Sequence, residues 1–247
     1  MLILGALFLC WGSFLNVIAY RIINEPRNFF GRSHCVHCRK TLAWYDLVPI
    51  FSFLFCGGKC RYCGQHISLL YPAIELFTAI SLLILFYALP TIYFLQYALY
   101  FSLLIITIRS DIEHMLISSF VTLYTLPIPL LLSFFQCLPI TFVDSLLGAL
   151  SGYLCLWSIG KLFYWWTGKQ GIGEGDFEML ALIGAWTGML GCWFAVTLGS
   201  VIGVISGIAI QAHRKTIDDI KIPFAPCLAL GSMIFVFCSH YVIFYLM

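Results

Sequence analysis

Two aspartates stand at the edges of apolar stretches, where a carboxylate is costly and usually functional. Asp111 lies in the polar break Arg109–His114, and Asp176 closes the tetrapeptide Gly173-Glu174-Gly175-Asp176. Taken alone, each aspartate is as typical of a helix cap as of a functional carboxylate. Together they indicate a general acid–base pair, in which the ionised carboxylate activates a water and the other protonates the amine that departs from a hydrolysed amide. Gly173 and Gly175 would then form the loop that supports Asp176.

Four cysteines occur as two C-x-x-C pairs, Cys35/Cys38 and Cys60/Cys63. This spacing turns both sulfurs of each pair toward one point and predicts a tetrahedral Zn²⁺ site. A redox role and a fortuitous spacing are the alternatives. Because four protein ligands leave no open coordination position, the zinc is expected to be structural. It would supply the fold of a loop that holds little apolar material.

The composition defines the surroundings of these residues. Hydrophobic residues make up 62% of the 247 residues and charged residues only 10%, whereas soluble domains carry about 25% charged residues. The chain cannot cover a water-facing surface, so we expect an all-α, polytopic integral membrane protein surrounded by lipid. Its net charge of +2 is too small to imply a nucleic-acid partner.

A helix needs about 20 apolar residues to cross the hydrocarbon core of a membrane. The sequence predicts about eight such helices, near residues 1–20, 68–89, 91–109, 115–136, 145–166, 177–189, 191–211 and 226–246. The stretch 177–211 is short for two full spans, and a tight turn at 188–191 is expected to divide it. Gly199, Gly203 and Gly207 recur every four residues and are expected to face a neighbouring helix.

The basic residues predict the orientation of these helices. All thirteen fall in or beside the loops of one side, and the opposite connections at 90, 137–144 and 189–191 carry none. By the positive-inside rule, the basic side is cytoplasmic and both termini lie outside. The basic residues are Arg21, Arg27, Arg32, Arg39, Lys40, Lys59, Arg61, Arg109, Lys161, Lys169, Arg214, Lys215 and Lys221.

Further motifs accompany the aspartates and cysteines. In chain order they are Gly12-Ser13-Phe14-Leu15-Asn16-Val17, Trp44-Tyr45-Asp46-Leu47-Val48-Pro49, Tyr71-Pro72-Ala73-Ile74-Glu75, Ile183-Gly184-Ala185-Trp186 and Ile222-Pro223-Phe224-Ala225-Pro226. Taken with the two C-x-x-C pairs, Asp111 and Gly173–Asp176, this ordered set resembles the type IV prepilin peptidases. These are aspartic proteases of the same G-x-G-D type as presenilin. The likeness runs over most of the chain.

The resemblance implies an enzyme of the bacterial inner membrane. It would remove the short basic leader of type IV prepilins or of the related pseudopilins of type II secretion. N-methylation of the new amine with S-adenosylmethionine is also implied, although no glycine-rich nucleotide loop of the Rossmann type occurs in the sequence. The expected parts are a first transmembrane helix at 1–20, a cytoplasmic zinc-binding loop at 21–67 and a membrane-embedded peptidase core at 68–247.

Three positions depart from the family pattern. Ile117 is followed by Ser118 and Ser119 instead of Pro-Asp, Glu178 replaces a common Lys, and Ala225 replaces a usual Gly. These changes leave the aspartate pair intact but bear on substrate preference and helix geometry.

Acidic residues near the pair are candidate substrate-binding groups. Glu75 would contact the methyl donor or the pilin amine; the alternative is a carboxylate that snorkels or pairs with a loop Arg. Glu174 and Glu178, with Glu113, Asp218 and Asp219, would attract a basic leader, or they would merely balance nearby Lys and Arg residues.

A second class of function is a transporter or a non-enzymatic assembly factor whose zinc loop binds a cytoplasmic partner. A transporter would show internal repeats and broken helices near the membrane midplane. The sequence has no convincing repeat, and its acids sit at one side, which favours the peptidase.

Overall fold

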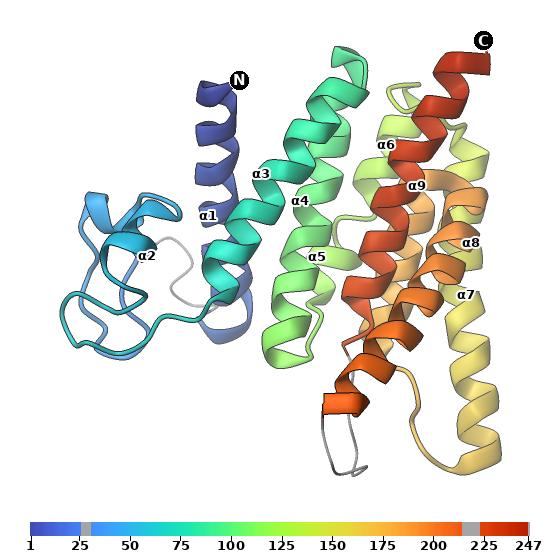
Figure 1. The fold of residues 1–247 in the computed structure, drawn as a ribbon. Coiled ribbons are helices and arrows are strands. Elements are labelled where there is room, and N and C mark those ends of the chain that lie inside the picture. Colours follow the sequence, from blue (N-terminus) through green and yellow to red (C-terminus); the bar gives the residue numbers. More distant parts are fainter. Residues whose placement is uncertain (26–30, 214–222, 247) are drawn as a thin grey trace. The chain divides into compact units, whose positions relative to one another are not determined.

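The computed structural model describes residues 1–25, 31–213 and 223–246, with the side chains of His213 and of residues 240–246 left aside. The chain forms two compact units, Met1–Ser110 and Asp111–Met247 (Figure 1). Within the described residues every regular element is helical, which confirms the expected all-α class. Seven residues used in the predictions lie outside the described part: Arg27, Arg214, Lys215, Asp218, Asp219, Lys221 and Ile222.

The first unit is built on α1 (Leu2–Asn24), η2 (Trp44–Leu47), α2 (Phe51–Phe55), α3 (Leu70–Ala88) and most of α4 (Thr91–His114). Buried polar side chains tie its long helices together. The Asn16 amide donates to the Tyr71 carbonyl at 3.1 Å and accepts from Arg109 Nε at 3.0 Å. The Arg109 guanidinium also lies 4.8 Å from the Tyr71 ring centroid. These contacts connect α1, α3 and α4 inside an apolar unit.

The second unit holds α5 (Ser119–Thr122), α6 (Pro127–Phe134), α7 (Phe142–Thr167), α8 (Glu174–His213) and α9 (Ala225–Leu246). Glycines let its helices approach closely. A Cβ at Gly184 would overlap the Gly148 carbonyl of α7, and a Cβ at Gly199 would lie 3.1 Å from the Cys227 carbonyl of α9. The predicted role of Gly199 in helix packing is therefore confirmed.

Helix α8 is two helices that meet at Gly188. This residue has φ 73° and ψ −178°, which is not helical and which glycine adopts without a steric penalty. The first half packs along α7, with Phe177 near Gly160 at one end of the contact and Gly184 near Gly148 at the other. The second half packs against α9 near Gly199. The chain reverses at Gly188, as the orange ribbon shows (Figure 1). The predicted turn is confirmed.

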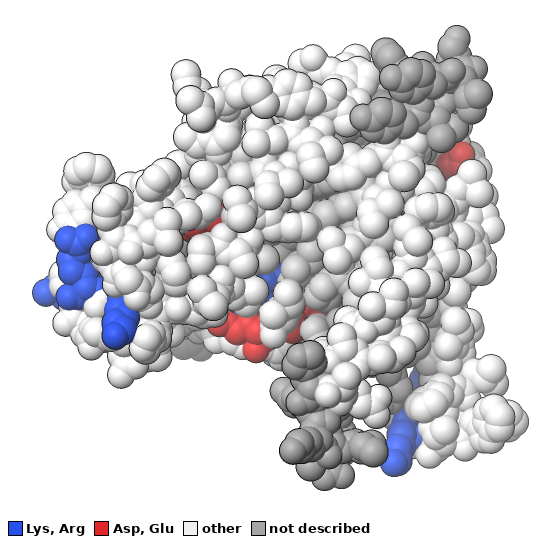
Figure 2. Space-filling model, in the orientation of Figure 1, with Lys and Arg blue, Asp and Glu red and all other residues white. Residues whose placement is uncertain are grey.

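The polytopic prediction is also borne out. Within the described residues, five helices are long and apolar enough to cross a membrane: Leu2–Asn24, Leu70–Ala88, Thr91–His114, Phe142–Thr167 and Glu174–Ala212. Two shorter apolar segments, Ser119–Phe134 and Ala225–Ser239, accompany them. With α8 divided at Gly188, eight apolar segments follow one another in the predicted order. On the face drawn in Figure 2, the surface over the helices is almost free of charged side chains.

Two boundaries differ from the prediction. The stretch expected as one span at 115–136 is divided into α5 and α6, because Pro127 and Pro129 lack the N–H groups that would bond to the carbonyls of Leu123 and Thr125 in a continuous helix. The polar break expected at Arg109–His114 is helical, and α4 ends only at His114, before Met115, whose φ is 52°. These polar residues include no Gly or Pro, so they end the apolar stretch without ending the helix. Asp111 therefore lies in the last turn of α4.

Candidate active site and metal centre

Asp111 is held by the start of α9. Its side chain is buried, and its Oδ2 accepts a hydrogen bond of 3.1 Å from the backbone N–H of Ala225, the first residue of that helix. The N-terminal N–H groups of a helix carry partial positive charge, which suits a carboxylate. The sequence places Ala225 in a motif but did not predict this contact. Pro223 and Pro226, which flank Phe224 and Ala225, were the available signal that a helix begins here.

Asp176 is the third residue of α8 and helps to begin that helix. The backbone N–H of Gly173 donates to the Asp176 carboxylate, and the Asp176 N–H donates back to the Gly173 carbonyl at 3.2 Å. This is the acidic half of a capping box, in which the carboxylate three residues into a helix binds the residue before it. The Asp176 and Asp111 carboxylates interact electrostatically. The structure therefore brings the two predicted aspartates together in one unit.

The two glycines of the G-x-G-D motif have different surroundings. A Cβ at Gly175 would lie 2.7 Å from Cβ of Ile117, closer than real side chains approach. A Cβ at Gly173 would meet only the Asp176 Oδ2, at the ordinary distance of 3.5 Å. The motif thus needs glycine at position 175 to seat the start of α8 against the segment that follows α4.

Glu178 lies one turn into α8 and is bound by α5. Its carboxylate accepts from Thr122 Oγ1 at 2.7 Å and from Ser119 Oγ at 3.0 Å. Two departures from the family pattern, Ser119 and Glu178, therefore contact each other, and two hydroxyl groups donate hydrogen bonds to the Glu178 carboxylate. Glu174, by contrast, is exposed at the first position of α8. The predicted substrate-binding roles of both glutamates stay predictions.

Glu75 lies in the first unit, on α3. Its Oε2 accepts from the backbone N–H of Ile50 at 2.8 Å, and the Ser13 side chain also hydrogen-bonds the carboxylate. A Cβ at Gly12 would lie 2.9 Å from the Glu75 Cα, so α1 and α3 cross closely at this point. The carboxylate therefore joins the cysteine-containing loop to the two helices that flank it. A contact from Glu75 to substrate or methyl donor stays a prediction.

The four predicted cysteines form one cluster. The sulfurs of Cys35, Cys38, Cys60 and Cys63 all lie within 4.8 Å of one another, and those of Cys35 and Cys63 are 3.9 Å apart. A disulfide needs about 2.05 Å, whereas a tetrahedral zinc with Zn–S bonds of about 2.3 Å places its sulfurs about 3.8 Å apart. The donor set and its spacing fit a structural zinc ion.

Local hydrogen bonds favour ionisation of one of these thiols. Burial of Cys60 opposes its thiolate, but hydrogen bonds from the backbone of Cys63 and Tyr62 and from the Cys35 and Cys63 side chains outweigh that effect. Together they lower the pKa of Cys60 from 9.0 to about 7. Thiolate is the form that binds metal.

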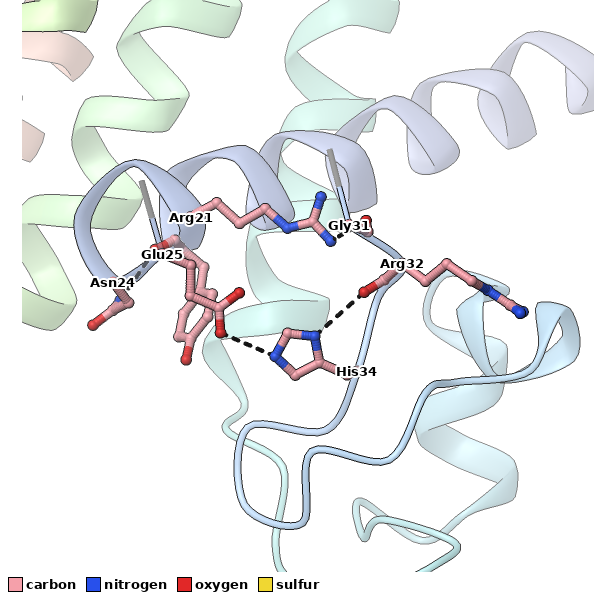
Figure 3. Close-up of polar contacts among 7 residues, drawn as sticks. Arg21, Asn24, Glu25, Gly31, Arg32 and His34 are labelled. Carbon is pink, nitrogen blue, oxygen red and sulfur yellow. Dashed lines mark hydrogen bonds and ion pairs between the residues drawn. The ribbon is translucent and has the colours of Figure 1, made fainter. Parts of the chain in front are cut away.

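Polar contacts join the first cysteine knuckle to the end of α1 (Figure 3). Arg21 Nη2 donates to the Gly31 carbonyl at 2.6 Å, and the His34 ring Nε2 lies 3.0 Å from Glu25 Oε1. Because His34 precedes Cys35 in the chain, these contacts fix where the knuckle begins relative to α1.

Comparison with known proteins places the chain in a family. Residues 5–89 match the model of the bacterial peptidase A24 N-terminal domain, and residues 98–208 match that of the type IV leader peptidase family. No solved structure shows a significant match.

Curated relatives match along most of the chain. A protein of Pectobacterium carotovorum named prepilin leader peptidase/N-methyltransferase is 31% identical over 93% of this chain and 90% of its own length. Proteins of the same name from Aeromonas hydrophila and Pseudomonas aeruginosa are 32% and 33% identical, each over 90% of this chain and 85% of their own length. The chain belongs to the type IV leader peptidase family.

Proposed function

We propose that the protein is an aspartic endopeptidase that removes the basic leader of type IV prepilins or pseudopilins, with Asp111 and Asp176 as its catalytic pair. The observation that carries the proposal is the meeting of these two carboxylates at helix ends in one unit. The names of the curated relatives give the substrate class.

In the proposed mechanism one carboxylate removes a proton from water, which attacks the scissile carbonyl. The other carboxylic acid protonates the departing amine. The N–H of Ala225 orients Asp111 and that of Gly173 orients Asp176. Each carboxyl group therefore keeps a second oxygen for water or substrate.

We further propose that the protein N-methylates the new N-terminus, as the names of the relatives imply. S-adenosylmethionine would supply the methyl group, and we assign no residue to its site. The zinc ion held by Cys35, Cys38, Cys60 and Cys63 would be structural.

The proposed placement is the bacterial inner membrane, with both termini outside. The division into a first transmembrane helix at 1–20, a cytoplasmic zinc loop at 21–67 and a peptidase core at 68–247 is part of this proposal. The one-sided distribution of Lys and Arg supports the orientation.

The test is leader removal from a co-expressed pilin, followed by mass spectrometry of the pilin N-terminus. Asp111→Asn and Asp176→Asn should each lower processing by several orders of magnitude, because an amide cannot transfer the proton. Methylation is read in the same spectrum.

Asp144→Asn is the matched control. Asp144 is exposed in the first turn of α7, and this substitution should leave processing unchanged. Near-normal processing by either catalytic variant would remove that residue from the mechanism. If the protein were a non-enzymatic assembly factor, the pilin leader would stay in place even when the protein carries no substitution.

A further inference from the structure

The metal-binding loop contains an apolar segment that faces outward. No charged residue occurs between Asp46 and Lys59, and Phe51, Leu54 and Phe55 of α2 are 57%, 66% and 84% exposed. Three large apolar side chains on one five-residue helix make a contiguous patch, and such patches mark interaction surfaces.

The hydrogen bond between Ile50 and Glu75 sets the level of this segment along the membrane helices. Glu75 is five residues into α3 and therefore about 7.5 Å along the helix from its first residue. It lies against Gly12 of α1, which is twelve residues, or about 18 Å, before the last residue of that helix. Ile50 directly precedes α2. The short helix therefore begins beside the bodies of α1 and α3 and not beyond their ends, as Figure 1 shows within the first unit.

The charged residues of the loop lie outside this segment. Arg61 Nε pairs with Asp46 Oδ1 at 3.1 Å, and Lys40 Nζ lies 4.5 Å from the Tyr62 ring centroid. Arg39 and Lys59 are exposed, and Figure 2 shows basic side chains gathered on this part of the molecule. An apolar face next to basic residues is the pattern of a segment that lies in a membrane interface, with its cations at anionic headgroups.

We propose that Leu47–Phe55 is seated in the lipid interface, with Phe51, Leu54 and Phe55 among the acyl chains. The occupant of the patch is lipid, because the Glu75 contact places the segment at the depth of two membrane helices. The loop that holds the metal centre would then be anchored to the membrane, with its apolar segment in lipid and its cysteine knuckles in water. This inference depends on the membrane helices and not on the peptidase activity.

The experiment uses the full zinc-loaded chain in lipid nanodiscs. A fluorescent amino acid replaces Phe55 in one sample and Val36 in another. Val36 is the matched control because it is also an exposed apolar residue of the loop, at 47% exposure, but lies in the first cysteine knuckle. Nitroxide-labelled phospholipid quenches probes in the acyl region, and iodide quenches probes in water.

The Phe55 probe should lose most of its fluorescence to nitroxide lipid and little to iodide, and the Val36 probe should show the reverse. Quenching of the Phe55 probe by iodide alone would place the segment in water and overturn the proposal. Protection of that probe from both quenchers would mean that protein covers the patch, which also overturns it. Retention of one zinc per chain shows that the labelled loop is folded. If the Phe55-labelled protein loses its zinc, a probe at Leu54 is used in its place.

Discussion

The two units of the molecule reach precise geometry by opposite means. In the first, side chains span the gaps between segments: Glu75 binds the Ile50 backbone, Asn16 binds Arg109, and four thiols meet at one point. In the second, glycines let neighbouring segments approach closely, as at Gly148 against Gly184 and at Gly175 against the Ile117 side chain. Gly12 in the first unit, and the hydrogen bonds of Asp111 and Glu178 in the second, are exceptions.

This difference predicts which substitutions each unit tolerates. Contacts made by side chains fail when atoms are removed, because a buried donor or acceptor loses its partner. Contacts made by bare glycine fail when atoms are added, because the backbones must separate. The first unit should thus be sensitive to truncation and the second to added methyl groups.

Removal of the metal should have the largest effect on the first unit. Cys35→Ser/Cys60→Ser should reduce zinc from one per chain to none, and loss of binding free energy of about 10 kcal/mol should unfold the loop. Elemental analysis and limited proteolysis between residues 31 and 69 measure both results. Cys137→Ser is the control, since Cys137 lies outside the cluster. Stoichiometric zinc in the double variant would refute the assigned ligands.

The next largest effect concerns the G-x-G-D motif of the second unit. Gly175→Ala should lower the rate of leader removal by about 100-fold, because its Cβ would push α8 away from Ile117 and shift Asp176. Gly173→Ala adds the same atom without a clash and should cost much less. Pilin processing kinetics compare the two.

A rescue variant distinguishes this steric effect from general damage. Ile117→Gly removes the Cβ that Gly175→Ala would strike, so the double variant should regain part of the activity. Equal losses for Gly173→Ala and Gly175→Ala, with no rescue, would contradict the contrast between the units.

A smaller effect is expected at Glu75. Glu75→Ala leaves the Ile50 N–H without its acceptor, which should cost about 1–3 kcal/mol of local stability in the loop, whereas Glu75→Gln retains an acceptor oxygen and should cost less. Hydrogen exchange at Ile50 and proteolysis of the loop measure the difference, with zinc content as a check of folding. Identical behaviour of the two variants would show that the carboxylate does not anchor the loop.

Short-range patterns and the pairing of the two aspartates were predictable from residue types, but the hydrogen bond that holds Asp111 was not. The C-x-x-C pairs and the reversal at Gly188 follow from local backbone rules, and the structure agrees with both. The Ala225 donor to Asp111 is 114 residues away in the chain, and no local preference of either residue encodes it.

Helix ends within the apolar stretches were predicted less well. The helix through Asp111 continues because helical propensity, and not polarity, decides where a helix ends. The opposite error occurred at Pro127, where apolar residues suggested one span although proline interrupts the backbone hydrogen bonds.

The smallest expected effects concern two glutamates of α8. Glu174 is exposed, so its charge is free to attract a basic leader, whereas Glu178 is bound by Thr122 and Ser119. The competing interpretation is that Glu174 only balances nearby Lys and Arg residues. Exposed charges contribute at most about 1 kcal/mol each, so either effect is small and must be recognised by its salt dependence.

If Glu174 attracts the leader, Glu174→Gln should lower the apparent second-order rate for a Lys-rich leader by about threefold at low salt. The defect should vanish in 1 M salt, where the Debye length is about 3 Å, and it should be absent for a leader without Lys or Arg. Glu178→Gln should instead slow charged and neutral leaders equally at every salt concentration, because it loosens the contact between α5 and α8. A salt-independent defect in Glu174→Gln would mean that the substitution disturbs the start of α8, and electrostatic attraction of the leader would have to be abandoned.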